Sequence, residues 1–384
     1  MKILMVSMPN LHFFRWTEQL QGAGHEIFWF DINDSRKKVE RLDGVKQIVG
    51  WKLRWDFPGR TFVKQKSPTF YRLIQKINER NTVKVFEKKL LEIKPDVVHS
   101  FALYISCTPI LRVMNKYPKM KWIFSSWGSD LYDLQNYPNH LNDIKKVLKK
   151  VDYLIADCNR DYQIAKKHGY ENHFLGVFPG GGGYDLDKMK FKIAPFENKK
   201  TILIKGFQGR WGRAISILKA LENLQIILSP YTIVVFGADE EVIQFAKRSK
   251  METWQNFSVI GKIKQEEVFS LMENSFLYIG NSISDGMPNA LLEAICMGVF
   301  PIQSNPGKVT EELIIDGLNG LLLNDPENIE NITSTILYAI NNIEMIKKGI
   351  EYNTLNLTPN FDYFKIKEKV INSYLKVLNY NEFE

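Results

Sequence analysis

The sequence contains no apolar run near the ~20 residues that a membrane-spanning helix needs, so no such helix is expected. Its first ten residues, MKILMVSMPN, turn polar too soon for a secretory signal and are interpreted as a strand. Only three cysteines occur, and Cys107, Cys158 and Cys296 are far apart and have apolar neighbours. Free, buried thiols in a cytoplasmic protein are therefore expected, and a disulfide-stabilised secreted domain is not.

Signals for metal and nucleic-acid binding are equally scarce. No Asp-x-Asp pattern or histidine cluster suggests a metal, so no metal site and no cofactor are expected. The formal net charge is +8, and residues 52–94 alone carry twelve Lys/Arg against four Asp/Glu. No recognisable nucleic-acid-binding module accompanies this charge, so nucleic acid is not an expected partner.

The basic segment also contains aromatic residues, a combination that is typical of surfaces that bind anionic membranes. We expect residues 51–94 to dock on an anionic cytoplasmic leaflet, which would make the protein peripheral to the membrane. In this interpretation Trp51, Trp55 and Phe57 insert among headgroups, and the phosphates meet three cations: Lys52, Arg54 and Arg60. A pair of solvated amphipathic helices explains the same pattern and remains the alternative.

The length of 384 residues favours two domains. Short apolar strands alternate with helical segments on both sides of the glycine-rich stretch PGGGG at 179–183, which indicates two Rossmann-like domains. The first series of strands is KILMVSM, EIFWFDI, PDVVHSF, KWIFSSW and YLIADC, and the second is TILIKGF, YTIVVFG, FSVIG, FLYIGNS and GVFPIQS. We predict an α/β protein with a first domain at 1–180, a second at 195–355, and a helix at 356–384 that packs back on the first domain.

The stretch SDGMPNALLEAICMG, residues 284–298, combines a loop with the start of a helix. Gly286 allows the backbone to turn, and Pro288 suits the first turn of a helix. The amides of Met287 and Asn289 would then face a phosphate or a sugar hydroxyl. Glu293 lies one turn further, in an apolar run, where its carboxylate can accept hydrogen bonds from two ribose hydroxyls. A solvated glutamate that interacts with the helix dipole is the alternative.

Asp285 and Glu293 are separated by seven residues, and the element DGLNGLLL follows at 316–323. This segment resembles the donor-binding segment of family-4 retaining glycosyltransferases, which belong to glycosyl transferases group 1 and have the GT-B fold. The resemblance implies two Rossmann-like domains that face each other across a cleft. It also implies that the C-terminal domain binds a nucleoside diphosphate sugar, with UDP or GDP as the expected nucleotide.

The resemblance assigns donor-binding roles to matching positions. Glu293 would hold the ribose, while Asp285 and the backbone of Gly286 to Asn289 (GMPN) would contact the transferred sugar and the distal phosphate. The family places two cations after the first strand of this domain, at positions that here are Phe207 and Gly212. We therefore assign the diphosphate to Lys205 and Arg213, with Arg210 in reserve and surface cations as the alternative. The base would lie against backbone near three residues, Gly237, Lys262 and Ile263.

The same resemblance places the acceptor in the N-terminal domain. His99 would lie at the carboxyl end of its strand, and Asp130 matches an aspartate of a family loop in which Trp127 replaces a histidine. Asn10 and His12, in the first loop, would contact the acceptor. A core histidine and a helix-capping aspartate are the alternatives for His99 and Asp130.

The sequence thus predicts a metal-independent retaining enzyme that transfers a sugar to a hydroxyl of a glycan or lipid-linked glycan, as in polysaccharide or lipopolysaccharide synthesis. The catalytic groups would be His99, Asp130, Lys205, Arg213 and Asp285. A nucleotide-sugar epimerase or a phosphorylase of the same fold is an alternative enzyme. A non-catalytic, membrane-associated protein that binds nucleotide sugars is the alternative from another class.

Overall fold

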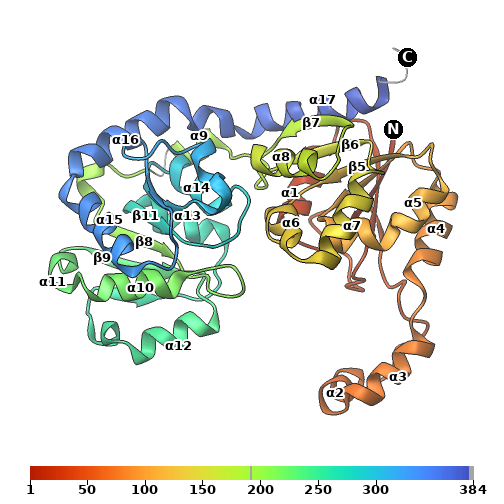
Figure 1. Ribbon diagram of the computed structural model, residues 1–384, viewed down its shortest axis with the longest axis horizontal. Coiled ribbons are helices and arrows are strands. Elements are labelled where there is room, and N and C mark those ends of the chain that lie inside the picture. Colours follow the sequence, from red (N-terminus) through yellow and green to blue (C-terminus); the bar gives the residue numbers. More distant parts are fainter. Residues whose placement is uncertain (191–192, 380–384) are drawn as a thin grey trace. The chain divides into compact units, whose positions relative to one another are not determined.

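The computed structural model describes residues 1–190 and 193–379, which form two compact units (Figure 1). The N-terminal unit comprises 1–156, 162–177 and the chain from Val370 onward, and the C-terminal unit comprises 157–161 and 178–369. The short segment Asp157–Asp161 thus groups with the C-terminal unit, although it directly follows a strand of the N-terminal sheet. Within the described residues, no helix is long and apolar enough to cross a membrane.

The N-terminal unit is built on a parallel sheet with the strand order β3-β2-β1-β4-β5-β6-β7. Its strands are β1 (Lys2–Ser7), β2 (Glu26–Asp31), β3 (Lys46–Ile48), β4 (Val97–Phe101), β5 (Lys121–Ser125), β6 (Tyr153–Ala156) and β7 (His173–Val177). The α-helices that follow these strands are α1 (Leu11–Gln19), α2 (Arg60–Lys66), α3 (Pro68–Asn78), α4 (Thr82–Ile93), α5 (Leu111–Lys116), α6 (Ser129–Tyr132), α7 (Pro138–Leu148) and α8 (Asn159–Lys167).

The C-terminal unit contains a second parallel sheet, in the order β10-β9-β8-β11-β12-β13. Its strands are β8 (Thr201–Lys205), β9 (Thr232–Phe236), β10 (Phe257–Val259), β11 (Ser275–Gly280), β12 (Phe300–Ser304) and β13 (Leu321–Leu323). Its helices are α9 (Leu186–Lys190), α10 (Ala214–Glu222), α11 (Gln225–Leu228), α12 (Glu240–Arg248), α13 (Gln265–Glu273), α14 (Asn289–Cys296), α15 (Ile329–Asn341), α16 (Ile343–Asn356) and the first part of α17 (Tyr363–Asn379).

Both faces of the C-terminal sheet are buried, as its apolar strands require. Along β8, Ile202 and Ile204 pack with α10 and α15 on one face. Leu203, which points the other way, packs with α13 and α14 on the opposite face. Alternate residues of one strand therefore enter two cores, and the polar groups of the unit are displaced to the ends of its strands.

The predicted α/β class is confirmed, although the sequence pattern missed three of the strands. The patterns did not mark β3, β7 or β13 as strands. The end of α17 belongs to the N-terminal unit, where Tyr374 is buried and accepts a hydrogen bond from Trp16 Nε1 over 2.9 Å. The last five residues of the helix expected at 356–384 lie outside the described part. The three cysteines are buried and free.

Candidate active site

The carboxyl ends of the parallel strands in the C-terminal unit gather the predicted donor-binding residues at one edge of the sheet. Lys205 ends β8, Gly237 follows β9, and Lys262 and Ile263 follow β10. The loop that contains Asp285 follows β11 and leads into α14. Because parallel strands place their carboxyl ends at the same edge, residues far apart in sequence come together there.

The loop before α14 is fixed by a close contact with a half-buried acid. Gly286 lies against Asp157, so a Cβ at position 286 would stand 2.0 Å from the Asp157 Oδ2 atom. Its N–H donates to Asp285 Oδ1 over 2.9 Å. Pro288, with φ at −66°, caps the helix that begins at Asn289. Only glycine fits at position 286, and the helix start is held at the edge of the sheet.

Arg160 holds the same loop from the other side. Its Nη2 donates to the Asp285 carbonyl over 2.7 Å and to Asp161 Oδ1 over 2.8 Å. Its Nη1 donates to the Pro306 carbonyl over 2.8 Å. One guanidinium thus joins the loop after β11 to the loop after β12, and it also offsets the charge of a fully buried aspartate.

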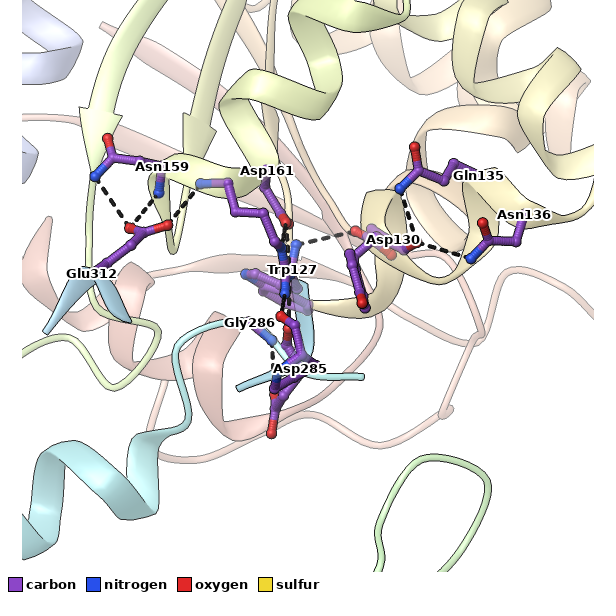
Figure 2. Close-up of polar contacts among 12 residues, drawn as sticks. Trp127, Asp130, Gln135, Asn136, Asn159, Asp161, Asp285, Gly286 and Glu312 are labelled. Atoms are coloured by element: carbon purple, nitrogen blue, oxygen red, sulfur yellow. Dashed lines mark hydrogen bonds and ion pairs between the residues drawn. The ribbon is translucent and has the colours of Figure 1, made fainter. Parts of the chain in front are cut away.

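The segment around Arg160 is anchored by a second carboxylate. Glu312 accepts hydrogen bonds from the backbone N–H groups of Asn159 and Arg160, over 2.7 and 2.8 Å. Figure 2 shows Glu312 against Asn159, and Asp161 above Asp285 and Gly286. Negative charge at the start of a helix is favourable, and here it fixes the beginning of α8 within the C-terminal unit.

Burial shifts the ionisation of these carboxyl groups. It raises the pKa of Asp285 to about 6, and the nearby charges of Arg160 and Lys205 oppose this increase. Burial also raises the pKa of Asp157, to which the neighbouring charge of Asp161 contributes. Asp285 therefore titrates close to neutral pH, where a small change in surroundings decides its charge.

Atoms of Asp157, Cys158 and Asp161 lie within 4.8 Å of one another, close enough in principle to hold a metal ion. The Arg160 guanidinium already contacts Asp161 there and opposes a second cation. Burial raises the pKa of the Cys158 thiol, so it favours the protonated form, which is a poor ligand. This chemistry fits an ion-paired carboxylate better than a metal site.

Glu293 is buried in the first turns of α14, as expected for a functional acid in an apolar run. Its Oε1 accepts a hydrogen bond from Gln265 Nε2 over 2.5 Å. Gln265 begins α13, directly after the loop that contains Lys262 and Ile263. A carboxylate has acceptor sites for several donors, and the hydroxyls of a ribose are donors of the right kind.

Lys205 brings positive charge to the two acids. Burial lowers the pKa of its ammonium, while the charges of Glu293 and Asp285 raise it. Gly237, with φ at +61°, leaves room for this side chain, because a Cβ there would stand 3.0 Å from Lys205 Nζ. The ammonium also lies 4.8 Å from the centre of the Phe236 ring. Lys205, Asp285 and Glu293 thus form one electrostatic group.

The other two predicted cations have different surroundings. Arg213 precedes α10, and its Nε donates to Glu327 Oε1 over 2.5 Å. Arg210 is exposed and lies over the ring of Trp211, with 5.1 Å between its Cζ and the ring centre. The loop that carries them is tied to the loop after β11, since the Arg213 N–H donates to the Asn281 carbonyl over 3.0 Å. Arg213 would have to break its ion pair with Glu327 before its guanidinium could contact a diphosphate.

Several predicted acceptor residues lie at the carboxyl edge of the N-terminal sheet. Asn10 caps α1 by accepting the Phe13 N–H over 2.8 Å. His12, in the first turn of α1, lies with its ring centre 5.7 Å from that of Trp127. Asp130 Oδ2 accepts the N–H groups of Trp127 and Leu103, over 3.2 and 2.9 Å, and so joins the loops after β5 and β4. Asp130 shapes this edge as a capping residue.

His99 does not lie where the resemblance placed it. It is in the middle of β4, not at its end, and its side chain is fully buried. Its Nδ1 and Nε2 atoms are within 2.6 Å of Tyr374 Oη and 2.8 Å of Ser125 Oγ. Burial holds the pKa of this imidazole well below its usual value. Both ring nitrogens are engaged inside the core, so we correct the prediction and assign His99 a structural role.

Comparison with known proteins places this site in a family. Residues 185–355 match the family described as glycosyl transferases group 1. The matched residues make up most of the C-terminal unit, which is therefore similar to a group 1 glycosyltransferase domain. An uncharacterised glycosyltransferase of Methanocaldococcus jannaschii is 25% identical over 310 residues, which cover 74% of this chain and 77% of that protein.

Solved structures extend the likeness to the whole chain. Sucrose-phosphate synthase of Thermosynechococcus elongatus superimposes with a TM-score of 0.73 at 14% identity, covering 98% of this chain and 99% of that one. HepE of Anabaena, in complex with UDP and glucose, gives 0.68 at 12% identity, with coverages of 98% and 100%. The lipopolysaccharide outer core galactosyltransferase WaaB gives 0.64 at 17% identity, with coverages of 97% and 100%. These likenesses confirm the GT-B fold.

The C-terminal unit contains functional candidates that the sequence did not reveal. Arg160 donates to the Asp285 carbonyl, Asp157 lies against Gly286, and Gln265 donates to Glu293, yet each is distant in sequence from its partner. Arg160 stands 125 residues before Asp285. One signal was present, because the segment DCNRD after β6 places two acids and an arginine at the carboxyl end of a buried strand.

Proposed function

We propose that this protein is a retaining glycosyltransferase that transfers a sugar from a nucleoside diphosphate to a hydroxyl of a glycan or lipid-linked glycan. The observation that carries the proposal is the convergence of Lys205, Asp285 and Glu293 at the carboxyl edge of the sheet in a group 1 domain. A cation and two acids in one partly buried site match the charges and hydroxyls of a nucleotide sugar.

Each group has a distinct role in this proposal. Glu293 accepts hydrogen bonds from the ribose hydroxyls, and Asp285 accepts one from the transferred sugar. The N–H groups at the start of α14 face the distal phosphate, where the helix dipole favours negative charge. Lys205 neutralises the charge that develops on the diphosphate as the bond to the sugar breaks, which is the main source of acceleration. Arg213 joins it after release from Glu327.

In the proposed reaction the bond between the sugar anomeric carbon and the diphosphate oxygen breaks. The acceptor oxygen bonds to that carbon on the same face, and the acceptor proton passes to the departing phosphate oxygen. No protein nucleophile is required. The acceptor would be held at the edge formed by Asn10, His12 and Trp127, whose aromatic rings suit the apolar face of a sugar.

Relatives favour a uridine nucleotide and a cell-surface product. HepE has been crystallised with UDP-glucose as well as with UDP, and WaaB acts on the lipopolysaccharide outer core. We extend these properties to the present chain as a proposal: the donor is a UDP-sugar, with a GDP-sugar as the second candidate, and the acceptor is a polysaccharide or lipopolysaccharide precursor.

A donor screen followed by product analysis tests the proposal. UDP-, GDP- and ADP-sugars are compared by thermal unfolding, since a ligand at ~100 times its dissociation constant adds about 2.7 kcal/mol to the free energy of unfolding. The stabilising donor is then incubated with candidate acceptors, and the anomeric configuration of the product is read by NMR. Inversion would contradict the retaining mechanism. Isomerisation of the donor without transfer would identify an epimerase instead.

A further inference from the structure

The region of the N-terminal unit between β3 and α4 contains two short helices with an unusual composition. Residues 57–78, which include α2 and α3 and are called the arm below, contain five Lys/Arg and no Asp/Glu. The cations are Arg60, Lys64, Lys66, Arg72 and Lys76. Figure 1 shows α2 and α3, in orange, set apart from the sheet of their own unit.

The arm exposes large apolar side chains that a water-facing helix would not need. Phe70, Leu73 and Ile77 follow one another on α3 at the spacing of a single helix face. Together with Phe62 on α2, they are between 54% and 67% exposed. Contiguous exposed apolar residues of this kind mark interaction surfaces. Cations at Arg72 and Lys76 adjoin the apolar stripe.

The base of the arm is firmly held, so its position is a built feature of the unit. Asn78 is buried, and its Oδ1 accepts the N–H groups of Arg54 and Trp55, over 3.1 and 2.9 Å. Its Nδ2 donates to the Trp55 carbonyl over 2.9 Å. Arg80 Nη1 donates to the Trp51 carbonyl over 2.9 Å. The segment that leads into the arm and the segment that leaves it are therefore hydrogen-bonded to each other.

The structure narrows the membrane surface that the sequence placed at 51–94. Trp51 is buried and stacks on Phe30, with 4.8 Å between ring centres, so it cannot enter a bilayer. Tyr71 and Phe86 are also buried. Most of the large exposed apolar side chains of 51–94 belong to α2 and α3, and the others are Trp55, just before the arm, and Leu91 on α4. The buried face of α4 packs on the unit's core through Phe86 and Leu90. The predicted surface is thus centred on the arm and the exposed Trp55 beside it, without Trp51.

We propose that the arm docks the N-terminal unit on an anionic phospholipid bilayer, as on a cytoplasmic leaflet. Amphipathic helices with cations beside an apolar face lie in the plane of such an interface. The occupant is assigned by charge, because a segment with five cations and no acid complements a surface of lipid phosphates. The inference that docking brings the enzyme next to a lipid-linked acceptor rests on the proposed function, whereas docking itself does not.

Flotation of the full-length protein with vesicles tests the proposal. Vesicles of phosphatidylcholine alone are compared with vesicles that contain about 30 mol% phosphatidylglycerol. Both are tested at ~0.05 and ~0.5 M salt, on either side of the physiological ionic strength at which the Debye length is about 8 Å. We expect flotation only with anionic vesicles, and at least tenfold weaker partitioning at high salt. Equal flotation with both compositions, or none with either, would overturn the proposal.

Two variants and two controls separate the apolar contribution from the charge. Leu73→Ser with Ile77→Ser removes part of the apolar stripe, and Lys64→Glu with Lys66→Glu reverses two charges. Each should lower partitioning about tenfold or more. The matched controls are Ile226→Ser, at an apolar side chain 87% exposed on the other unit, and Lys145→Glu with Lys146→Glu on α7. The controls should bind as the wild type does.

Thermal unfolding and nucleotide binding are measured on every variant. Because the arm is remote in sequence from Lys205, Asp285 and Glu293, its variants should keep wild-type nucleotide affinity. Loss of flotation with intact nucleotide binding supports the docking surface. Wild-type flotation in the folded arm variants would overturn it. A protein that does not bind vesicles, and whose self-association is abolished by the same variants, would also overturn it. Absence of nucleotide binding in the wild type would contradict only the proposed function.

Discussion

The two sheets end in edges of different chemical character. At the edge of the C-terminal sheet, Lys205, Asp285 and Glu293 influence one another's charge, and burial shifts the pKa of Lys205 and of Asp285. In the N-terminal unit, Asp130 caps a loop and His99 is enclosed in the core. In the proposed function, the C-terminal unit therefore supplies the reactive charges and the N-terminal unit supplies shape for the acceptor.

Removal of the cation from the C-terminal edge should have the largest effect. Lys205→Gln is expected to lower kcat/KM by about 10²- to 10³-fold, the loss typical of a group that stabilises developing negative charge. Lys199→Gln is the matched control. Lys199 is also buried, but it donates to the Gly298 carbonyl over 2.8 Å, at the end of α14. Its replacement should lower the melting temperature and largely spare turnover in steady-state assays. Equal losses of kcat/KM in the two variants would contradict a direct role of Lys205 in the site.

Arg160 should come next, because it positions the loop that contains Asp285. Arg160→Gln leaves the buried Asp161 without its cation, and breaking such a pair costs about 3 to 5 kcal/mol. Arg160→Lys keeps the charge and provides a folded variant, for which we expect kcat to fall about tenfold. The exposed Arg248→Gln serves as the control. Single-turnover rates on folded protein test this, and wild-type rates in Arg160→Lys would assign Arg160 to stability alone.

The ionisation of Asp285 should set the acid limb of the pH profile. Its pKa of about 6 means that the carboxylate is lost below that pH, so kcat/KM should fall about tenfold per pH unit there. Asp285→Asn should lower activity at every pH and abolish this limb. A profile that retains the limb in Asp285→Asn would assign it to another group.

The same shift predicts an effect on stability. Because the folded pKa lies above the unfolded one, the contribution of Asp285 to stability is present below the unfolded value and is lost as pH rises through 6. Asp285→Asn should therefore raise the free energy of unfolding at pH 8, on the order of 1 to 3 kcal/mol. Urea unfolding at pH 4 and pH 8 measures this, and a gain at pH 4 alone would contradict the sign.

His99 should show the smallest effect on turnover. His99→Gln disrupts hydrogen bonds to Tyr374 and Ser125 inside the core, which should lower the free energy of unfolding by about 1 to 3 kcal/mol. Below its melting temperature the variant should transfer sugar within about twofold of the wild type. A loss of activity without a loss of stability would restore His99 to the acceptor site.

The sequence predicted those features that local pattern determines. The strands of both sheets that are apolar and bounded by turns were identified, and the spacing of Asp285 and Glu293 located the edge of the C-terminal sheet. The strands β3 and β13, with three residues each, were not identified, whereas β10, of the same length, was recognised because its apolar pattern FSVIG ends in a glycine. His99 was misplaced because an apolar strand pattern does not distinguish its centre from its end.

Contacts between distant segments were not predictable from one sequence. The role of Arg160 depends on Asp285 and Pro306, which lie on other loops. Arg213 was assigned to the diphosphate, whereas its guanidinium pairs with Glu327, 114 residues later. The buried position of Trp51 likewise follows from its contact with Phe30, which belongs to β2. Tertiary packing decides which polar and aromatic residues remain available to a ligand.

Nucleotide titration of the wild type and Glu293→Ala tests most directly the claim that the edge of the C-terminal sheet binds the donor. Calorimetry with UDP and GDP is expected to show binding to the wild type. Loss of charge-assisted hydrogen bonds, at about 1.5 to 3 kcal/mol each, should weaken that binding at least tenfold in Glu293→Ala. The exposed Glu266→Ala, on neighbouring α13, should bind as the wild type does. Equal affinity of wild type and a folded Glu293→Ala for the nucleotide would contradict the account.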